Sequence, residues 1–253
     1  MKILLSPAKS LNLDASYPSI ETSAPNLLKE SKKMYPYLKQ LNEQDIAEMM
    51  EISPKLASLN YERFQNLGKT TNLKRPAIYT FDGDVYDGID FYSVKESQLE
   101  LASQSIRILS GLYGILKPFD MIEPYRLEMG TTIQIGDFKN LYGFWGDQVT
   151  DALNQDLKKS KDTFVLNLAS QEYSKVVQAK KLAVPLKSCD FLENKDGKFK
   201  SISFFAKKAR GLMTRFILDH QICRWEDLRG FDYENYTFNT SLSSEDKLIF
   251  TRG

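Results

Sequence analysis

Two short, uninterrupted apolar runs predict strands that are buried on both faces. The first is KILLS at residues 2–6, and the second is FVLNLAS at residues 164–170. Runs of Ile, Leu and Val of this length are typical of inner strands. Both end in small polar residues, and ligands of open α/β sheets gather beyond the carboxyl ends of such strands. Ordinary strand-to-helix turns with a serine cap would give the same pattern. The candidates for one shared crevice are Ser6, Lys9, Asn167 and Ser170.

Apolar positions spaced for a helix dominate residues 24–66. Pro36 should kink or break the first helix of this region, and Pro54 suits the first position of a later one. A capping box from Ser93 to Glu96 predicts a helix over residues 93–104. A further helix is predicted over residues 140–160.

Two hairpins are predicted in the last third of the chain. Asp196-Gly197 is a tight-turn signal inside residues 186–205, and residues 233–253 indicate a second hairpin. Helices and strands therefore mix without strict βαβ alternation. With no repeat and no linker, we expect one compact domain over residues 1–253, of α+β class, with a mixed sheet flanked by helices.

The positive charge is concentrated in one region. The whole chain carries a net charge of +1, yet residues 195–215 hold seven bases and a single acid, Asp196. A local excess of this kind indicates a surface that meets a polyanion. The seven bases are Lys195, Lys198, Lys200, Lys207, Lys208, Arg210 and Arg215.

The sequence FFAKKARGLMTRFI at residues 204–217 predicts an amphipathic helix in this region. Gly211 falls inside its polar arc, where glycine costs about 0.5–1 kcal/mol relative to alanine and lets another backbone or a phosphate approach. A merely solvated face would interleave acids with the bases, and none follows Asp196 until Asp219. We therefore favour a polyanion-binding surface over a solvated face. The apolar side is small and needed for the core, which argues against membrane binding.

A glycine-punctuated turn marks the centre of the chain, in LSGLYGILKPFDMIEPYRLEMG at residues 109–130. Gly111 and Gly114 bracket a turn whose amides could receive a phosphate, and Lys117 and Arg126 follow. The turn resembles the hairpin of helix-hairpin-helix DNA-binding elements, although two residues separate the glycines where one is usual. A structural turn is an equal alternative.

The composition limits the chemistry. The only histidine, His220, and two scattered cysteines, Cys189 and Cys223, supply too few ligands for common zinc or iron sites. The acidic segment 81–92 superficially resembles an EF-hand but lacks the bidentate glutamate. We expect no metal, no cofactor and no activated thiol. No run is apolar enough to span a membrane, and MKILLSPAKS is too short for a signal-peptide core, so we expect a cytoplasmic protein.

Several long motifs, in this order, resemble the YaaA family of bacterial peroxide stress proteins over almost the full chain. They are ILLSPAKSL, GDVYDG, LSGLYGILKPFDMIEPYRLEMG, YGFWGD, NLASQEY and GKFKSISFFAKKARGLMTRFI. The resemblance implies a cytoplasmic protein that supports resistance to hydrogen peroxide. It also implies binding of double-stranded DNA in a basic cleft, on a single-domain α+β fold unlike the common superfolds.

The family pattern carries over to particular residues of this chain. Two departures matter: Asp82 stands where a base can occur, and Cys189 stands where proline is common, so we assign neither a role. The matching positions are Lys9, the GLYG turn with Lys117, Arg126, Lys207, Lys208 and Arg210.

Two functions therefore remain open. The first is binding of double-stranded or structured DNA without sequence preference, to shield it or aid its repair, with no obligate protein partner; here Lys198, Lys200 and Arg215 join the contacts. The second is an enzyme that acts on nucleotides or nucleic acid. Its crevice would hold Ser6, Lys9, Asn167, Ser170 and Tyr173, with acid–base groups among Asp84, Tyr125 and Glu128.

Overall fold

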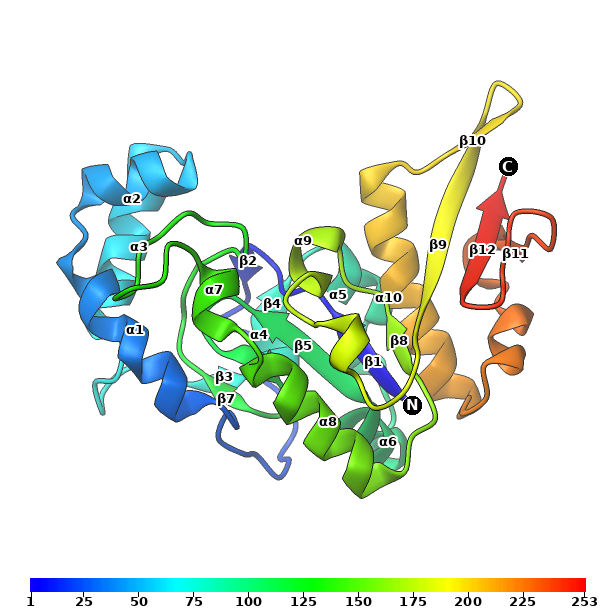
Figure 1. Cartoon of the computed structure of the whole chain (residues 1–253), viewed down its shortest axis with the longest axis horizontal. Coiled ribbons are helices and arrows are strands. Elements are labelled where there is room, and N and C mark those ends of the chain that lie inside the picture. Colours follow the sequence, from blue (N-terminus) through cyan, green and yellow to red (C-terminus); the bar gives the residue numbers. More distant parts are fainter.

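An eight-stranded mixed sheet forms the centre of the molecule (Figure 1). The computed structural model describes residues 1–253. The predicted α+β class and mixed sheet are confirmed. In spatial order the strands are β11 (Thr237–Phe238), β12 (Lys247–Arg252), β9 (Leu186–Lys195), β8 (Val165–Asn167), β1 (Lys2–Leu5), β5 (Ile106–Ser110) and β6 (Gly114–Leu116), and β10 (Lys198–Lys200) pairs with β9.

The two apolar runs lie side by side at the middle of this sheet. Strand β1 pairs in parallel with both β8 and β5, and Ile3, Leu4 and Leu5 are fully buried. The prediction that both runs are inner strands is therefore confirmed. Because Leu4 is in register with Asn167, the polar residues after β1 and β8 meet at one edge of the sheet.

Helices cover the sheet and extend the molecule to one side. Helices α1, α2 and α3 gather at the end opposite β11 and β12 (Figure 1). The helices are α1 (Leu28–Gln40), α2 (Glu43–Met50), α3 (Pro54–Asn66), α4 (Ala77–Thr80), α5 (Asp84–Ile89), α6 (Glu96–Ser105), α7 (Leu141–Trp145), α8 (Gln148–Ser160), α9 (Gln171–Ser174) and α10 (Ser203–His220). Short pairs form two further ribbons: β2 (Ser10–Leu11) with β4 (Phe81–Asp82), and β3 (Arg75–Pro76) with β7 (Met121–Ile122).

Three helix expectations need correction. Helix α1 continues through Pro36 without a break. Helix α6 begins at Glu96, after Lys95, because Ser93 belongs to a short 3₁₀ turn and donates its hydroxyl to the carbonyl of Asp90. The predicted helix over residues 140–160 is two helices, since Gly146 adopts a φ of 47° between them.

Both predicted hairpins are present. Asp196 and Gly197 have φ of 55° and 77°, the left-handed pair that a tight two-residue turn requires. The resulting β9–β10 hairpin projects beyond the body of the molecule (Figure 1). Strands β11 and β12 form the second, antiparallel hairpin.

The glycine turn of residues 111–114 joins two antiparallel strands, β5 and β6. It is therefore not a helix-hairpin-helix element, which needs a helix on each side. Gly111 and Gly114 are buried: a Cβ on Gly111 would lie 2.2 Å from the carbonyl oxygen of Leu127, and one on Gly114 would lie 3.0 Å from the ring of Trp145. Close packing thus explains both glycines.

Candidate functional site

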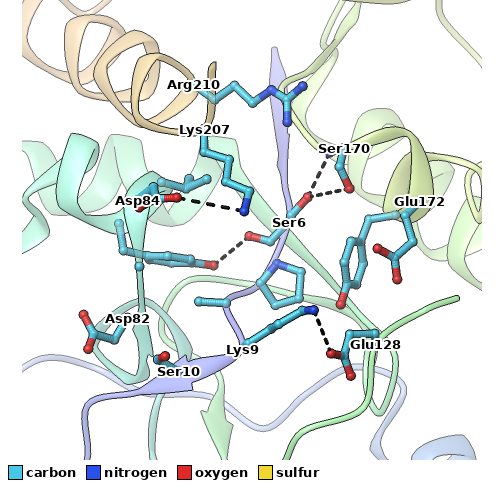
Figure 2. A pocket seen from close by; sticks show the side chains of 16 residues that line it. Ser6, Lys9, Ser10, Asp82, Asp84, Glu128, Ser170, Glu172, Lys207 and Arg210 are labelled. Atoms are coloured by element: carbon cyan, nitrogen blue, oxygen red, sulfur yellow. Dashed lines mark hydrogen bonds and ion pairs between the residues drawn. The ribbon is translucent and has the colours of Figure 1, made fainter. Parts of the chain in front are cut away.

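A pocket of about 470 Å³ opens beyond the carboxyl end of β1. The loop after β1 forms its floor, and α5, α9 and the first half of α10 form its walls (Figure 2). Parallel inner strands place their carboxyl ends at one edge, which is where ligands of such sheets bind. The expected shared crevice is therefore present.

The floor of the pocket ties β1 to the segment after β8. The backbone N–H of Ser170 donates to Ser6 Oγ at 2.9 Å, and the two hydroxyl oxygens lie 3.4 Å apart. Tyr86 donates its hydroxyl to the carbonyl oxygen of Ser6 at 3.0 Å. These bonds fix the loop that carries Lys9.

Two cations of α10 form the basic wall. Lys207 Nζ lies 3.9 Å from Asp84 Oδ2, at the limit of an ion pair, and its side chain is 53% exposed. Arg210 is half-buried, and its guanidinium has neither an acid within 4 Å nor a hydrogen-bond partner in the protein. Burial lowers the pKa of Arg210 from its usual value, and the negative charge of Asp190 offsets only part of this. A desolvated, unpartnered guanidinium is a receptor for an anion.

Carboxylates line the opposite wall. Glu128 Oε1 accepts two hydrogen bonds from Arg126, at 2.9 and 3.1 Å, and lies 3.3 Å from Lys9 Nζ. Glu128 Oε2 is buried without a partner. Glu172 Oε1 accepts the backbone N–H of Gly130 at 2.9 Å. The pocket therefore joins a wall that attracts anions to one that accepts protons or hydrogen bonds.

Two tyrosines next to the carboxylates stay protonated. Burial raises the pKa of Tyr173, which lines the pocket, and also that of Tyr125, which lies behind it. Tyr125 shares a 2.6 Å hydrogen bond with Ser110 Oγ and does not reach the pocket. Of these two, only Tyr173 can contact a ligand there.

Metal ligands are not gathered anywhere in the structure. No group of three or more His, Cys, Asp or Glu side chains lies close enough to share an ion. His220 ends α10 at the surface, with its ring 4.7 Å from that of Phe216. Cys189 is buried and Cys223 exposed, and neither forms a disulfide.

The pocket gathers residues from both sequence-based hypotheses. Lys9, Lys207 and Arg210 come from the proposed DNA contacts. Ser6, Ser170, Tyr173, Asp84 and Glu128 come from the proposed crevice. Asn167 does not line the pocket, because its side chain accepts the backbone N–H of Ala169 instead.

The other predicted DNA contacts are dispersed or paired. Lys117 is exposed but lines two other pockets. Lys208 lies 2.6 Å from Glu234, and Arg215 Nε lies 2.9 Å from Asp219. Their acids lie outside the basic segment, so the local charge count could not reveal these pairs. Lys198 and Lys200 are exposed on β10, while Arg126 pairs with Glu128 and the two glycines of the 111–114 turn are buried.

Sequence reasoning missed two residues of the pocket, Tyr86 and Glu172. Glu172 follows Ser170 by two positions in NLASQEY, so the same strand-end argument could have found it. Tyr86 lies in GDVYDG, and only the packing of α5 beside β1 brings its hydroxyl to Ser6.

The fold and the pocket define an α+β protein with a pocket of mixed charge at the carboxyl edge of its central strands. The chain belongs to the family of peroxide stress protein YaaA, whose family model matches residues 1–242. It is 49% identical over 254 residues to UPF0246 proteins of Flavobacterium psychrophilum and Flavobacterium johnsoniae, with both chains fully covered. It is 50% identical to a UPF0246 protein of Marinomonas sp., covering 100% of this chain and 97% of that one.

Proposed function

We propose that this peroxide stress protein binds DNA through the basic wall of the pocket. The observation that carries the proposal is Arg210, a half-buried guanidinium that faces the pocket and has no partner in the protein. Such a group gains most from an anion that replaces its lost water. Lys207 stands one helical turn before it, at the spacing of neighbouring phosphate contacts on one helix face.

The contacts available to DNA favour phosphate over bases. Lysine and arginine side chains on a helix and a strand-end loop bind the backbone and carry no sequence code. The basic cleft of this proposal is the surface from Lys9 through Lys207 and Arg210 to the exposed Lys198 and Lys200 on β10. Binding without sequence preference suits a protein that shields DNA or aids its repair under peroxide stress in the bacterial cytoplasm.

A direct test measures the affinity for a fluorescent DNA duplex by anisotropy at several salt concentrations. If about four phosphates are neutralised, log K should fall against log salt with a slope of roughly −3.6, and each lost contact should flatten it by about 0.9. Arg210→Ala and Lys207→Ala should each weaken binding and flatten the slope. Lys117→Ala, an exposed lysine that lines other pockets, is the matched control. Equal affinities for all four proteins would reject the proposal.

A second candidate is an enzyme that acts on a nucleotide unit in the same pocket. It is favoured by Glu128, whose buried Oε2 has no partner while Oε1 lies 3.3 Å from Lys9 Nζ. A carboxylate with a free oxygen beside an amine can move protons if Arg210 holds a phosphate nearby. Incubation with nicked, flapped or base-damaged DNA, with and without Mg²⁺, tests it. A product lost in Glu128→Gln would support this function, and no product from any substrate would reject it.

A further inference from the structure

Three phenylalanines are exposed at the junction of β10 and α10. Phe199, Phe204 and Phe205 have exposed fractions of 42%, 56% and 36%. Single exposed apolar side chains are ordinary, but three within seven residues form a patch that marks an interaction site. We call Phe199 and Phe204 the aromatic tip.

The third ring is already engaged. The guanidinium of Arg252 lies over the ring of Phe205, 4.8 Å from its centroid, and Phe204 meets Phe205 edge-on at 5.5 Å. Phe205 thus supports Phe204 from beneath. Phe199 lies on β10, in the hairpin that projects beyond the rest of the molecule (Figure 1). The aromatic tip is therefore the part of the patch that a partner can reach.

Unpaired positive charge surrounds the aromatic tip. Lys198 and Lys200 flank Phe199 on β10, both exposed and neither with an acid within 4 Å. Lys207 follows Phe204 by three residues, nearly one turn along the same side of α10. Since Lys207 also lines the pocket, the tip and the basic wall form one continuous surface.

We propose that the aromatic tip stacks on unpaired bases of DNA whose phosphates the neighbouring lysines hold. The inference rests on the proposed DNA binding and adds the kind of DNA preferred. Every base has a π-face, so exposed aromatic rings between cations bind bases without reading sequence. Rings that enter an intact duplex must first unstack its bases, a cost that a gap or mismatch bubble removes. The protein therefore prefers DNA with a break in base stacking.

A membrane surface is the rival partner for apolar and basic side chains together. Membrane-bound helices present a long apolar face, whereas α10 buries its apolar side and leaves only its first turn exposed. Continuity with Arg210, a phosphate receptor inside a pocket, favours nucleic acid.

The test compares the affinity for an intact duplex with that for the same duplex carrying a short single-stranded gap. Wild-type protein should bind the gapped DNA about tenfold more tightly. Phe199→Ala/Phe204→Ala should lose most of this preference yet keep its affinity for the intact duplex. Phe138→Ala, which removes a ring that is 45% exposed elsewhere, should keep the preference. A 2-aminopurine base at the gap should change fluorescence with wild type and not with the double variant.

Each outcome has a distinct meaning. No preference in wild type, or an equal preference in the double variant, overturns the aromatic tip while leaving DNA binding in place. Loss of all binding in Arg210→Ala with both DNAs concerns the basic wall alone. Binding to vesicles of equal parts phosphatidylglycerol and phosphatidylcholine that disappears in the double variant, without a gap preference, would assign the tip to a membrane instead. Urea unfolding of each variant shows whether it is folded.

Discussion

Gly88 of α5 and Gly211 of α10 face each other where the two helices cross. A Cβ on Gly211 would lie 1.9 Å from the carbonyl oxygen of Val85, and one on Gly88 would lie 2.2 Å from that of Lys208. Backbone meets backbone with no room for a methyl group. Because α5 carries Asp84 and α10 carries the basic wall, this crossing sets the width of the pocket.

Replacing Gly211 with alanine should therefore destabilise the fold and displace the basic wall. Alanine gains about 1 kcal/mol in helix propensity, but overpacking against a carbonyl oxygen costs about 1–3 kcal/mol or more, so the net effect is a loss. Urea denaturation measures it, together with DNA affinity. Gly230→Ala is the control, since its nearest neighbour would lie 3.8 Å away. Equal stability of Gly211→Ala and wild type would show that the helices can separate without cost.

Gly211 also shows how far a helical pattern can be trusted. The sequence places it in the polar arc of α10, and its alternatives were a nearby backbone or a phosphate. The backbone of α5 is the answer, so Gly211 and Thr214 are buried while Phe205 and Leu212 are only partly covered. A pattern gives the faces of a helix, but which face is buried depends on a partner distant in sequence.

The same limit applies to the candidate site. Strand ends in the sequence correctly predicted that Ser6, Lys9 and Ser170 meet, because parallel neighbours share an edge. Charge counting predicted a basic surface but not its ion pairs: Lys208 meets Glu234, which lies beyond the counted segment. The glycine turn was misassigned as phosphate-binding geometry because burial at Gly111 is a property of the tertiary fold.

The two cysteines should differ sharply in reactivity. Cys189 is 2% exposed, and burial raises the pKa of its thiol, so little thiolate forms near neutral pH. Cys223 is exposed. A thiol reagent such as Ellman's should modify one cysteine quickly in the native protein and the second only after unfolding. Cys223→Ser should abolish the fast phase. Two fast thiols in native protein would reopen a redox role for Cys189.

Asp219 should give a pH-dependent contribution to stability. Burial alone would raise its pKa, but hydrogen bonds from Gln98, Arg215 and Tyr233 outweigh this and hold the pKa below 3.8. A carboxyl whose pKa is lower folded than unfolded stabilises above the unfolded value and loses that effect as pH falls through the folded one. Asp219→Asn should therefore cost about 1 kcal/mol at pH 7, a small value because a quarter of the side chain is exposed.

Urea unfolding at pH 7 and below pH 3.8 checks this expectation. The difference in stability between wild type and Asp219→Asn should shrink at the lower pH, where the wild-type carboxyl begins to take up its proton. Asp137→Asn, at an exposed position without an ion pair, should show no such difference at either pH. A constant penalty across the range would mean that the geometry of the side chain, and not its charge, stabilises this junction.

Removing the charge of Glu128 should strengthen DNA binding, opposite to the effect of Arg210→Ala. Glu128 neutralises Lys9 and Arg126 at the pocket, so Glu128→Gln frees both cations while keeping the volume of the side chain. Affinity for a duplex should rise about threefold to tenfold at low salt, with a steeper salt slope. Glu21→Gln, an exposed acid that lines another pocket, is the control.

The same variant separates the two candidate functions. If Glu128 only screens its neighbours, Glu128→Gln tightens binding and changes nothing else. If its unpartnered Oε2 moves a proton, the variant binds DNA more tightly yet forms no product, because an amide oxygen cannot act as a base at neutral pH. Weaker binding in Glu128→Gln would contradict both readings, since removal of a negative charge beside phosphate can weaken binding only if the phosphate lies elsewhere.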